Sequence, residues 1–286
     1  CRPAGLECGA GGIVALITAL GQKRNMVDDN TARTALITGG AIRVGAAMAQ
    51  ALAADGWHVA IHYHASHDAA EALLAQIQGD GGRGHLVQAD LRDSGAVAGL
   101  IAAAGRDAPP LTCLINNASL FENDAALNMT AESWDDHQAV NLRAPLFLAR
   151  DFAKALADER SSNHRGVVVN MLDNKLFALN ADFFSYTVAK YGLLGATKVL
   201  AMELAPRIRV CGIAPGITLP SANQTEAGFR AAHAMNPLGQ SATPEQLVAA
   251  LRFILAAPSM TGEVITIDGG QSLPGMPRGV SFLAEN

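Results

Sequence analysis

Charged residues are scarce in this chain of 286 residues, at 16%, whereas hydrophobic residues make up 50%. Such a composition suits an interior that is buried on two faces. Acidic residues outnumber basic ones by 26 to 21, the net charge is −5, and the pI is near 5.9. Proteins whose main partner is nucleic acid present basic patches, so the composition argues against that class.

Cysteine is also rare, with four residues at positions 1, 8, 113 and 211 and no C-x-x-C pair. No disulfide framework is implied. Cys113 and Cys211 fall in apolar, strand-like runs, where cysteine acts as a small buried hydrophobe in a reducing compartment. We therefore expect a cytoplasmic protein.

No apolar run reaches the roughly 20 residues that cross a bilayer. The N-terminal "GGIVALITAL" spans only about ten residues, and its basic residues follow it, which is the wrong order for a signal peptide. Met26 stands shortly before the first strand-like run. We interpret residues 1–30 as an extension that is not part of the fold, and we predict no membrane partner.

Strand-like and helix-like patterns alternate from Thr34 onward. Continuously apolar strands between amphipathic helices indicate a parallel sheet covered on both faces. We predict one α/β domain over residues 31–275, a Rossmann-like doubly wound sheet of about seven strands, followed by a tail at 276–286. The longest interruption, about 217–242, is predicted to be a substrate loop. The strands are expected at 34–38, 58–64, 84–91, 111–119, 166–172, 208–216 and 263–270, and a long helix at 184–204.

A glycine-rich turn joins the first strand to the first helix in "ALITGGAIRVG". Gly39 and Gly45 allow a tight turn with close backbone approach, and the N-terminus of the helix, at Val44, favours a pyrophosphate. Arg43 replaces the middle glycine of the usual spacing. Its guanidinium could reach a phosphate or a substrate.

The second strand ends in "HYHAS", where an NAD site usually has an acidic residue for the ribose 2′-hydroxyl. His62, Tyr63, His64 and Ser66 offer hydrogen-bond donors instead. A 2′-phosphate is better accommodated than repelled, so NADPH is the predicted cofactor. A metal site at His62, His64 and His67 is the alternative, but no cysteine or carboxylate completes it, and we predict none.

Further cofactor contacts are expected where the third and fourth strands end. Asp90 and Leu91 are placed to touch the adenine, with a solvated turn aspartate as the plain alternative. "NNAS" supplies Asn117, Ala118 and Ser119, although asparagines are common in turns at such positions.

Tyr186 and Lys190 lie four residues apart, one helical turn, on the predicted helix 184–204. A phenol with a pKa near 10 is a poor catalyst at neutral pH, and a nearby ammonium is expected to lower that pKa. By itself Y-x-x-x-K is a common accident in helices.

The ordered motifs together resemble the short-chain dehydrogenase/reductase family over about residues 33–273. They are T-G-x-x-x-R-x-G (38–45), D-L (90–91), N-N-A-S (116–119), N-L-R-A-P (141–145), Y-T-V-A-K (186–190), A-P-G (214–216) and I-D-G-G (267–270). The resemblance implies a Rossmann-like fold and a homotetramer assembled through two long helices. It further implies Tyr186 as proton donor, Lys190 on the nicotinamide ribose and Asn141 in a relay. Pro215, Gly216 and Ile217 would shape the nicotinamide pocket.

Four departures from the family pattern resemble the pteridine reductases, which include dihydromonapterin and dihydrobiopterin reductases. They are Arg43, the "HYHAS" strand end, Phe121 after "NNAS", and Asp173 in place of serine. That subgroup often has arginine where this chain has Ala65.

Asp173 gives this resemblance a chemical reason. A serine donates a hydrogen bond to a ketone oxygen, which an ionised aspartate cannot do. A carboxyl group can instead hold the proton that a pterin ring nitrogen receives when its C=N bond is reduced. Phe121 is expected to stack on the pterin ring, and Arg43, Ser119 and Tyr186 to contact the substrate.

We therefore predict an NADPH-dependent pterin reductase that acts on a dihydropterin or a folate. The alternatives are a generic carbonyl or 3-oxoacyl thioester reductase, and a non-catalytic NADPH-binding protein. Asp173 and Phe121 argue against the first, and the intact Tyr186, Lys190 and Asn141 argue against the second.

Overall fold

One parallel sheet of seven strands organises the computed structural model, which describes residues 32–158, 165–220, 225–275, 278–279 and 283. The strand order is β3-β2-β1-β4-β5-β6-β7, and every neighbouring pair is parallel. The predicted doubly wound sheet is confirmed. The strands are β1 Thr34–Ile37, β2 His58–Tyr63, β3 Arg83–Gln88, β4 Leu111–Asn116, β5 Gly166–Met171, β6 Ile208–Pro215 and β7 Val264–Ile267.

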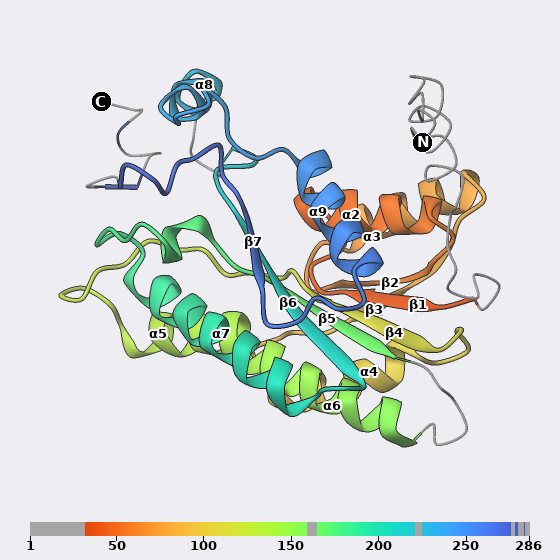
Figure 1. Cartoon of the computed structure of the whole chain (residues 1–286). Helices are drawn as coiled ribbons and strands as arrows, with labels where there is room; N and C mark the ends of the chain where they lie inside the picture. Colours follow the sequence, from red (N-terminus) through yellow and green to blue (C-terminus); the bar gives the residue numbers. More distant parts are fainter. Residues whose placement is uncertain (1–31, 159–164, 221–224, 276–277, 280–282, 284–286) are drawn as a thin grey trace, which may run out of the picture. The chain divides into compact units, whose positions relative to one another are not determined.

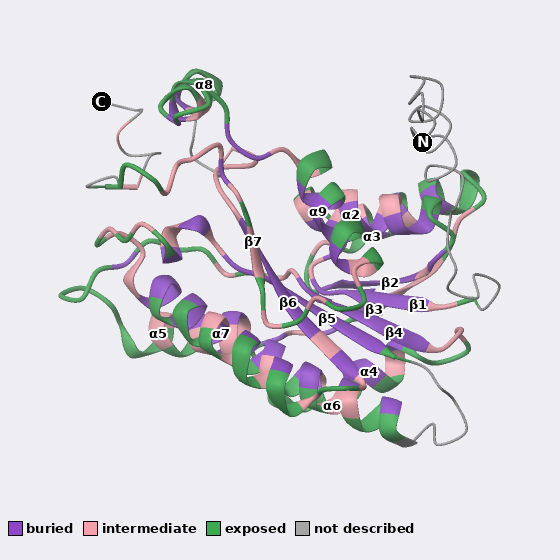
Figure 2. Ribbon diagram, viewed as in Figure 1, coloured by how far each residue is buried: buried purple, intermediate pink, exposed green. Residues whose placement is uncertain are grey.

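Helices cover both faces of the sheet (Figure 1). The helices α2 (Arg43–Ala54), α3 (His67–Gly79) and α9 (Pro244–Ala256) pack on one face, and α4 (Ser94–Ala104), α6 (Ala144–Asp158) and α7 (Phe184–Glu203) on the other. In β1, Ala35 and Ile37 join the first core while Leu36 joins the second, because successive strand residues point to opposite faces. The sheet is therefore buried on both sides (Figure 2).

Several short elements lie outside the regular alternation: α5 (Ala131–Gln138), the π-helical turn η1 (Ala139–Arg143), the 3-10 turn η2 (Asn174–Leu176) and α8 (Glu226–Ala234). The predicted loop at 217–242 thus contains a helix, which begins where the Thr225 hydroxyl accepts a hydrogen bond from the Gly228 N–H. Among the described residues, no helix combines the length and apolar character needed to cross a bilayer. Residues 1–30, and most of 276–286, lie outside the described residues.

The strand order reverses beside β1, because the chain runs outward to β2 and β3 and then returns to β4 on the other side of β1. In open parallel sheets, ligands bind at the carboxyl ends of the strands at such a switch point. Nearly all the predicted site residues follow the ends of β1, β2, β3, β4, β5 and β6. The topology therefore brings them to one edge of the sheet.

Candidate active site

Two adjoining cavities open at this edge. The glycine-turn cleft has a volume of about 500 Å³ and the tyrosine pocket about 360 Å³, and Arg43, Val44 and Ser119 line both. The cleft is also lined by the predicted residues Gly39, Gly45, His62, His64, Asp90, Leu91, Asn117 and Ala118. The pocket is also lined by the predicted residues Phe121, Asp173, Tyr186, Gly216 and Ile217. Pro215 is the last residue of β6 and precedes Gly216.

The glycine turn has the geometry that the sequence predicts. Gly39 has a φ of +59°, and a Cβ atom on Gly45 would lie 2.2 Å from the Gly39 carbonyl oxygen. Helix α2 begins without a side-chain cap and without an acidic residue in its first turn. Its first N–H groups are therefore left for an anion in the cleft, which fits a pyrophosphate.

Arg43 has a φ of +56°, in the left-handed region that glycine adopts readily. For a non-glycine residue this left-handed conformation costs roughly 1–2 kcal/mol. The guanidinium Nη1 donates to the Pro220 carbonyl at 2.9 Å. Arg43 thus joins the glycine turn to the segment after β6.

Thr38 joins the chain segments that follow β1 and β4. Its hydroxyl oxygen accepts hydrogen bonds from the Asn117 and Ala118 N–H groups at 2.9 and 3.0 Å. The Asn117 side-chain amide donates to the Thr38 and Gly39 carbonyls at 2.9 and 3.1 Å. Asn117 therefore supports the glycine turn from behind, and Ala118 packs against Gly39.

His62 has a different role from the predicted phosphate donor. It is 2% exposed, its Nδ1 accepts from the Gly39 N–H at 3.0 Å, and its Nε2 donates to the Ala89 carbonyl at 3.1 Å. Burial lowers the pKa of His62 from 6.5 to about 4, so the ring is neutral at pH 7. Both nitrogens are engaged within the protein, which corrects the prediction: His62 shapes the turn.

The other polar residues of "HYHAS" lie in different surroundings. Tyr63 is buried and its hydroxyl hydrogen-bonds His67 Nδ1 at 3.0 Å, so it does not line the cleft. His64 does line the cleft, with a side chain 51% exposed and its Nε2 3.6 Å from Asp90. Ser66 precedes α3 without a capping hydrogen bond from its side chain. In the described part of the chain, no group of three or more His, Cys, Asp or Glu side chains has a metal-binding arrangement.

Tyr186 and Asp173 form the central contact of the tyrosine pocket. The Tyr186 hydroxyl donates to Asp173 Oδ2 at 2.7 Å, and the Lys175 N–H donates to Asp173 Oδ1 at 2.8 Å. Burial raises the pKa of Asp173 above 3.8, although both hydrogen bonds and Lys190 act in the opposite direction. The carboxyl group is thus able to hold a proton at a higher pH than an exposed aspartate.

Lys190 does not lower the pKa of Tyr186 as the sequence suggested. Burial, followed by the Asp173 carboxylate, raises the pKa of Tyr186 well above 10. The Lys190 ammonium, buried behind the pocket, donates to the Met171 carbonyl at 2.7 Å, and burial lowers its pKa to about 8. That prediction is wrong because a carboxylate, rather than the ammonium, touches the phenol. Tyr186 remains a neutral hydrogen-bond donor.

Asn141 is fully buried in the π-helical turn η1. Its Oδ1 accepts from the Ser119 hydroxyl at 3.1 Å and from the Leu120 N–H at 3.0 Å, and its Nδ2 donates to the Leu120 carbonyl at 2.8 Å. These bonds hold the segment after β4, including Ser119, beside Tyr186.

Phe121 lines the pocket with 47% of its surface exposed. One ring face stacks on Phe183 at a centroid distance of 4.1 Å and an interplanar angle of 14°. The Tyr186 ring meets Phe121 edge-on at 4.7 Å. The exposed remainder of the ring offers an aromatic surface directly beside the reacting groups.

The structure adds residues that the sequence analysis missed. Arg92 lines the cleft and pairs with Asp90 and Asp136 at 2.9 and 3.3 Å. Lys175, Asn180, Phe183 and Gln271 line the pocket. They belong to no motif, and only the nearness of Lys175 to Asp173 in the chain could have indicated one of them.

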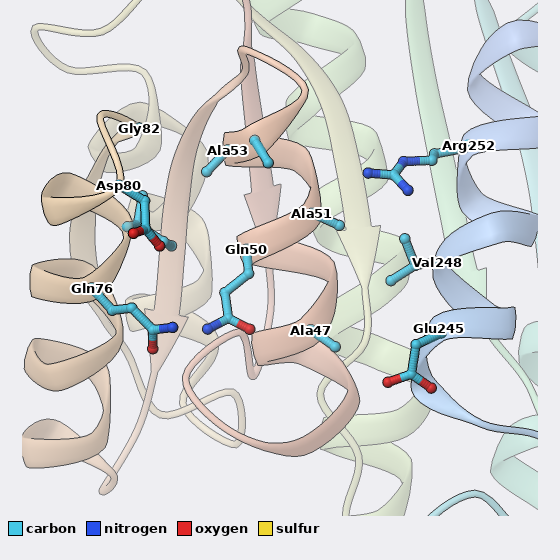
Figure 3. Close-up of a pocket in the computed structure, with 12 residues that line it drawn as sticks. Ala47, Gln50, Ala51, Ala53, Gln76, Asp80, Gly82, Glu245, Val248 and Arg252 are labelled. Atoms are coloured by element: carbon cyan, nitrogen blue, oxygen red, sulfur yellow. The ribbon is translucent and has the colours of Figure 1, made fainter.

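A separate cavity of about 500 Å³ lies between α2, α3 and α9. Figure 3 shows Gln50 of α2 between Gln76 and Asp80 on one side and Val248 and Arg252 of α9 on the other. None of its lining residues also lines the cleft or the pocket. Its side chains give no sign of a reactive group.

The substitution His62→Gln tests the structural role of this histidine. Because the folded pKa is depressed from 6.5 to about 4, the stabilisation is complete above pH 6.5 and is lost as the pH falls toward 4. The difference in free energy of unfolding between wild type and variant should shrink by roughly 3 kcal/mol over that range. Urea unfolding between pH 7 and pH 4 measures it. A difference that does not change with pH would contradict the assignment.

Comparisons with known proteins agree with this geometry. The family model described as "Enoyl-(Acyl carrier protein) reductase" matches residues 40–272. A 3-oxoacyl-[acyl-carrier-protein] reductase of Synechocystis sp. is 31% identical over 246 residues, which are 84% of this chain and 97% of that protein. Crystal structures of FolM alternative dihydrofolate reductase 1 with NADP, from Brucella suis and Brucella canis, are 41% and 40% identical, with TM-scores of 0.80 and 0.79. They cover 86% of this chain and 96% and 95% of theirs. The chain belongs to the short-chain dehydrogenase/reductase family of oxidoreductases.

Proposed function

We propose that this protein is an NADPH-dependent reductase that transfers hydride to the C=N bond of a dihydropterin and so forms a tetrahydropterin. The observation that carries the proposal is the hydrogen bond of 2.7 Å between Tyr186 and a partly buried Asp173, where a ketone reductase of this family would have serine. The similarity to two FolM dihydrofolate reductases supports the same substrate class.

The cleft fits a dinucleotide. The uncapped N-terminus of α2, Gly39 and Gly45 suit the pyrophosphate, and Asp90 and Leu91 the adenine. The family resemblance assigns Lys190 to the nicotinamide ribose, although its ammonium donates to the Met171 carbonyl and Lys190 lines neither cavity. The cleft is also lined by Asn117, Ala118 and Ser119, and Pro215, Gly216 and Ile217 would flank the nicotinamide. When bound, NADPH supplies the hydride.

The protein's own residues supply the proton. Reduction of C=N places hydride on carbon and leaves the ring nitrogen in need of one proton. The buried Asp173 carboxyl, with its raised pKa, is proposed to hold that proton, and the Tyr186 hydroxyl to orient and relay it. Phe121 is proposed to stack on the pterin ring, while Ser119 and Arg43 contact its polar edge. Solvent then returns the proton to the carboxylate.

Carbonyl reduction, including that of 3-oxoacyl thioesters, remains the alternative because a 3-oxoacyl-[acyl-carrier-protein] reductase is among the relatives. A ketone oxygen needs a hydrogen-bond donor. In the structure Asp173 accepts the hydrogen bond of the Tyr186 hydroxyl, whereas a serine at this position would supply a second donor to the ketone oxygen. The geometry therefore favours the pterin.

The substitution Asp173→Ser tests the proton-holding role. Dihydropterin turnover should fall at least roughly tenfold, since a lost acid–base partner costs about a hundredfold or more. Any carbonyl reduction should hold steady or rise, and NADPH affinity should barely change. Asp173→Asn keeps the shape without a titratable proton and should behave alike toward the pterin, whereas Tyr186→Phe should abolish both activities.

Steady-state rates with dihydrobiopterin and an acetoacetyl thioester, plus NADPH titration by fluorescence, give these values. Asp55→Ser is a suitable control, because Asp55 pairs with Arg252 away from both cavities. Intact pterin turnover in Asp173→Ser would make the carboxylate a structural turn residue.

Cofactor choice is proposed to depend on His64, which lines the cleft at the end of β2. Wild-type enzyme should show a higher kcat/KM with NADPH than with NADH. His64→Asp places an acid where NAD-binding enzymes carry one, and should lower the NADPH/NADH ratio at least roughly tenfold. An equal preference in the wild type would show that Ala65 leaves the 2′-phosphate without a sufficient partner.

A homotetramer is proposed from the apolar surface of α7. Val188, Tyr191, Val199 and Met202 are spaced to share one helix face, and Met202 is 72% exposed. Such exposed apolar stripes mark interaction surfaces. Light scattering at micromolar concentration should report four chains; a monomer would contradict the proposal. A cytoplasmic location stays a prediction from the sequence.

A further inference from the structure

Lys175 places a half-buried ammonium in the wall of the tyrosine pocket, two residues beyond Asp173. Its Nζ donates to Asn180 Oδ1 at 2.5 Å and also to the Asp182 carbonyl oxygen. Both acceptors are uncharged. Two of the three donors of the ammonium are therefore used, and no direct ion pair with a carboxylate is found for Lys175 within the described residues. Burial lowers the pKa of Lys175, and the nearby Asp173 and Asp182 carboxylates act against that effect.

Asp182, one of the two carboxylates that act on Lys175, is hydrogen-bonded elsewhere. The Asp182 carboxylate accepts two hydrogen bonds from Arg278 Nε, at 2.9 and 3.0 Å, and one from the Gly279 N–H at 2.7 Å. Asp182 thus offers Lys175 its backbone carbonyl and gives its charge to Arg278. The wall therefore holds the Lys175 ammonium through uncharged oxygens, without a direct ion pair.

The charge of the pocket follows from its lining. Its charged side chains are Arg43 and Lys175, which are positive, and Asp173. Burial raises the pKa of Asp173 and lowers that of Lys175, and with all three groups ionised the lining carries two positive charges and one negative. The pocket is therefore net positive in a protein whose net charge is −5. A substrate with an anionic group suits it better than a neutral one.

The reaction fixes where such a group would emerge. In a 7,8-dihydropterin the C=N bond joins N5 to C6, and the side chain is attached to C6. That side chain leaves the ring beside Asp173 and Tyr186, where Lys175 forms the adjoining wall. Resting on the proposed function, we propose that Lys175 is a specificity-determining residue that selects dihydropterins whose C6 side chain carries a carboxylate, as dihydrofolate does, over those with an uncharged side chain, such as dihydrobiopterin.

The test compares both substrates in wild type and in Lys175→Met, Lys175→Gln and Lys175→Arg. In the wild type, kcat/KM should be higher for dihydrofolate than for dihydrobiopterin. Lys175→Met and Lys175→Gln should lower kcat/KM for dihydrofolate roughly tenfold, mainly through KM, because a charge-assisted contact is lost. The value for dihydrobiopterin should stay within about twofold, and Arg should retain the preference. Salt at about 0.5 M should weaken the preference in wild type and in Lys175→Arg, the two proteins that keep the charge.

Binding without turnover gives a second readout. Calorimetry with NADP⁺-saturated protein should show weaker folate binding in Lys175→Gln and unchanged biopterin binding. Arg106→Met, which removes an exposed positive charge after α4, is the matched control and should change neither.

Three results would overturn the inference. Equal losses of kcat/KM for both substrates would mean that Lys175 only supports the wall formed with Asn180 and Asp182. An unchanged folate preference in the variants would mean that Lys175 has no part in selectivity. If Lys175→Gln keeps the folate preference and Lys175→Met loses it, then hydrogen bonding rather than charge determines the preference. Failure of the proposed function looks different: the wild type would reduce neither pterin while turning over the thioester.

Discussion

The buried carboxyl group of Asp173 is the constraint around which the site is arranged. Removing a carboxylate from water costs several kcal/mol unless hydrogen bonds or charges compensate. Here the Lys175 N–H and the Tyr186 hydroxyl each donate to one of its oxygens, and Lys190 lies close enough to lower its pKa. Because these interactions only partly offset burial, the pKa of Asp173 stays raised and that of Tyr186 rises with it. A proton is thereby kept within a pair that a family member with serine would lack.

The fold delivers both members of this pair to one point. Asp173 follows β5, whereas Tyr186 sits in the first turn of α7, which begins at Phe184. Phe183 precedes that helix in a left-handed conformation without capping it, and Asp124 does so instead by accepting from the Ser185 N–H at 2.9 Å. Asp124 belongs to the segment after β4, the same segment that Asn141 holds. The end of β4 therefore positions the helix that carries the tyrosine.

Most of the fold could be predicted from the sequence, because strands buried on both faces are apolar without interruption and glycine turns mark where helices follow. The site residues that stand directly after strands could be predicted too, because the strands themselves could be located in the sequence. Side-chain direction was harder to predict. His62 and His64 both line the cleft, yet the ring nitrogens of His62 are engaged by Gly39 and Ala89, whereas His64 is about half exposed. The raised pKa of Tyr186 depends on a contact with a residue thirteen positions away. Helix α8 lies in a segment rich in turn-forming residues, which concealed it.

Positively charged side chains lie at both cavities. Away from both cavities Arg252 pairs with Asp55, and within the cleft Arg92 pairs with Asp90 and Asp136. Around the site, three cations contact uncharged oxygens instead. Lys190 donates to the Met171 carbonyl, Lys175 to Asn180 and the Asp182 carbonyl, and Arg43 to the Leu219 and Pro220 carbonyls. These contacts fix the direction of each cation, and none of the three forms a direct ion pair with a carboxylate among the described residues. In this acidic protein, positively charged side chains thus stand at the edge of the sheet where a phosphate-bearing cofactor and an acidic substrate would bind.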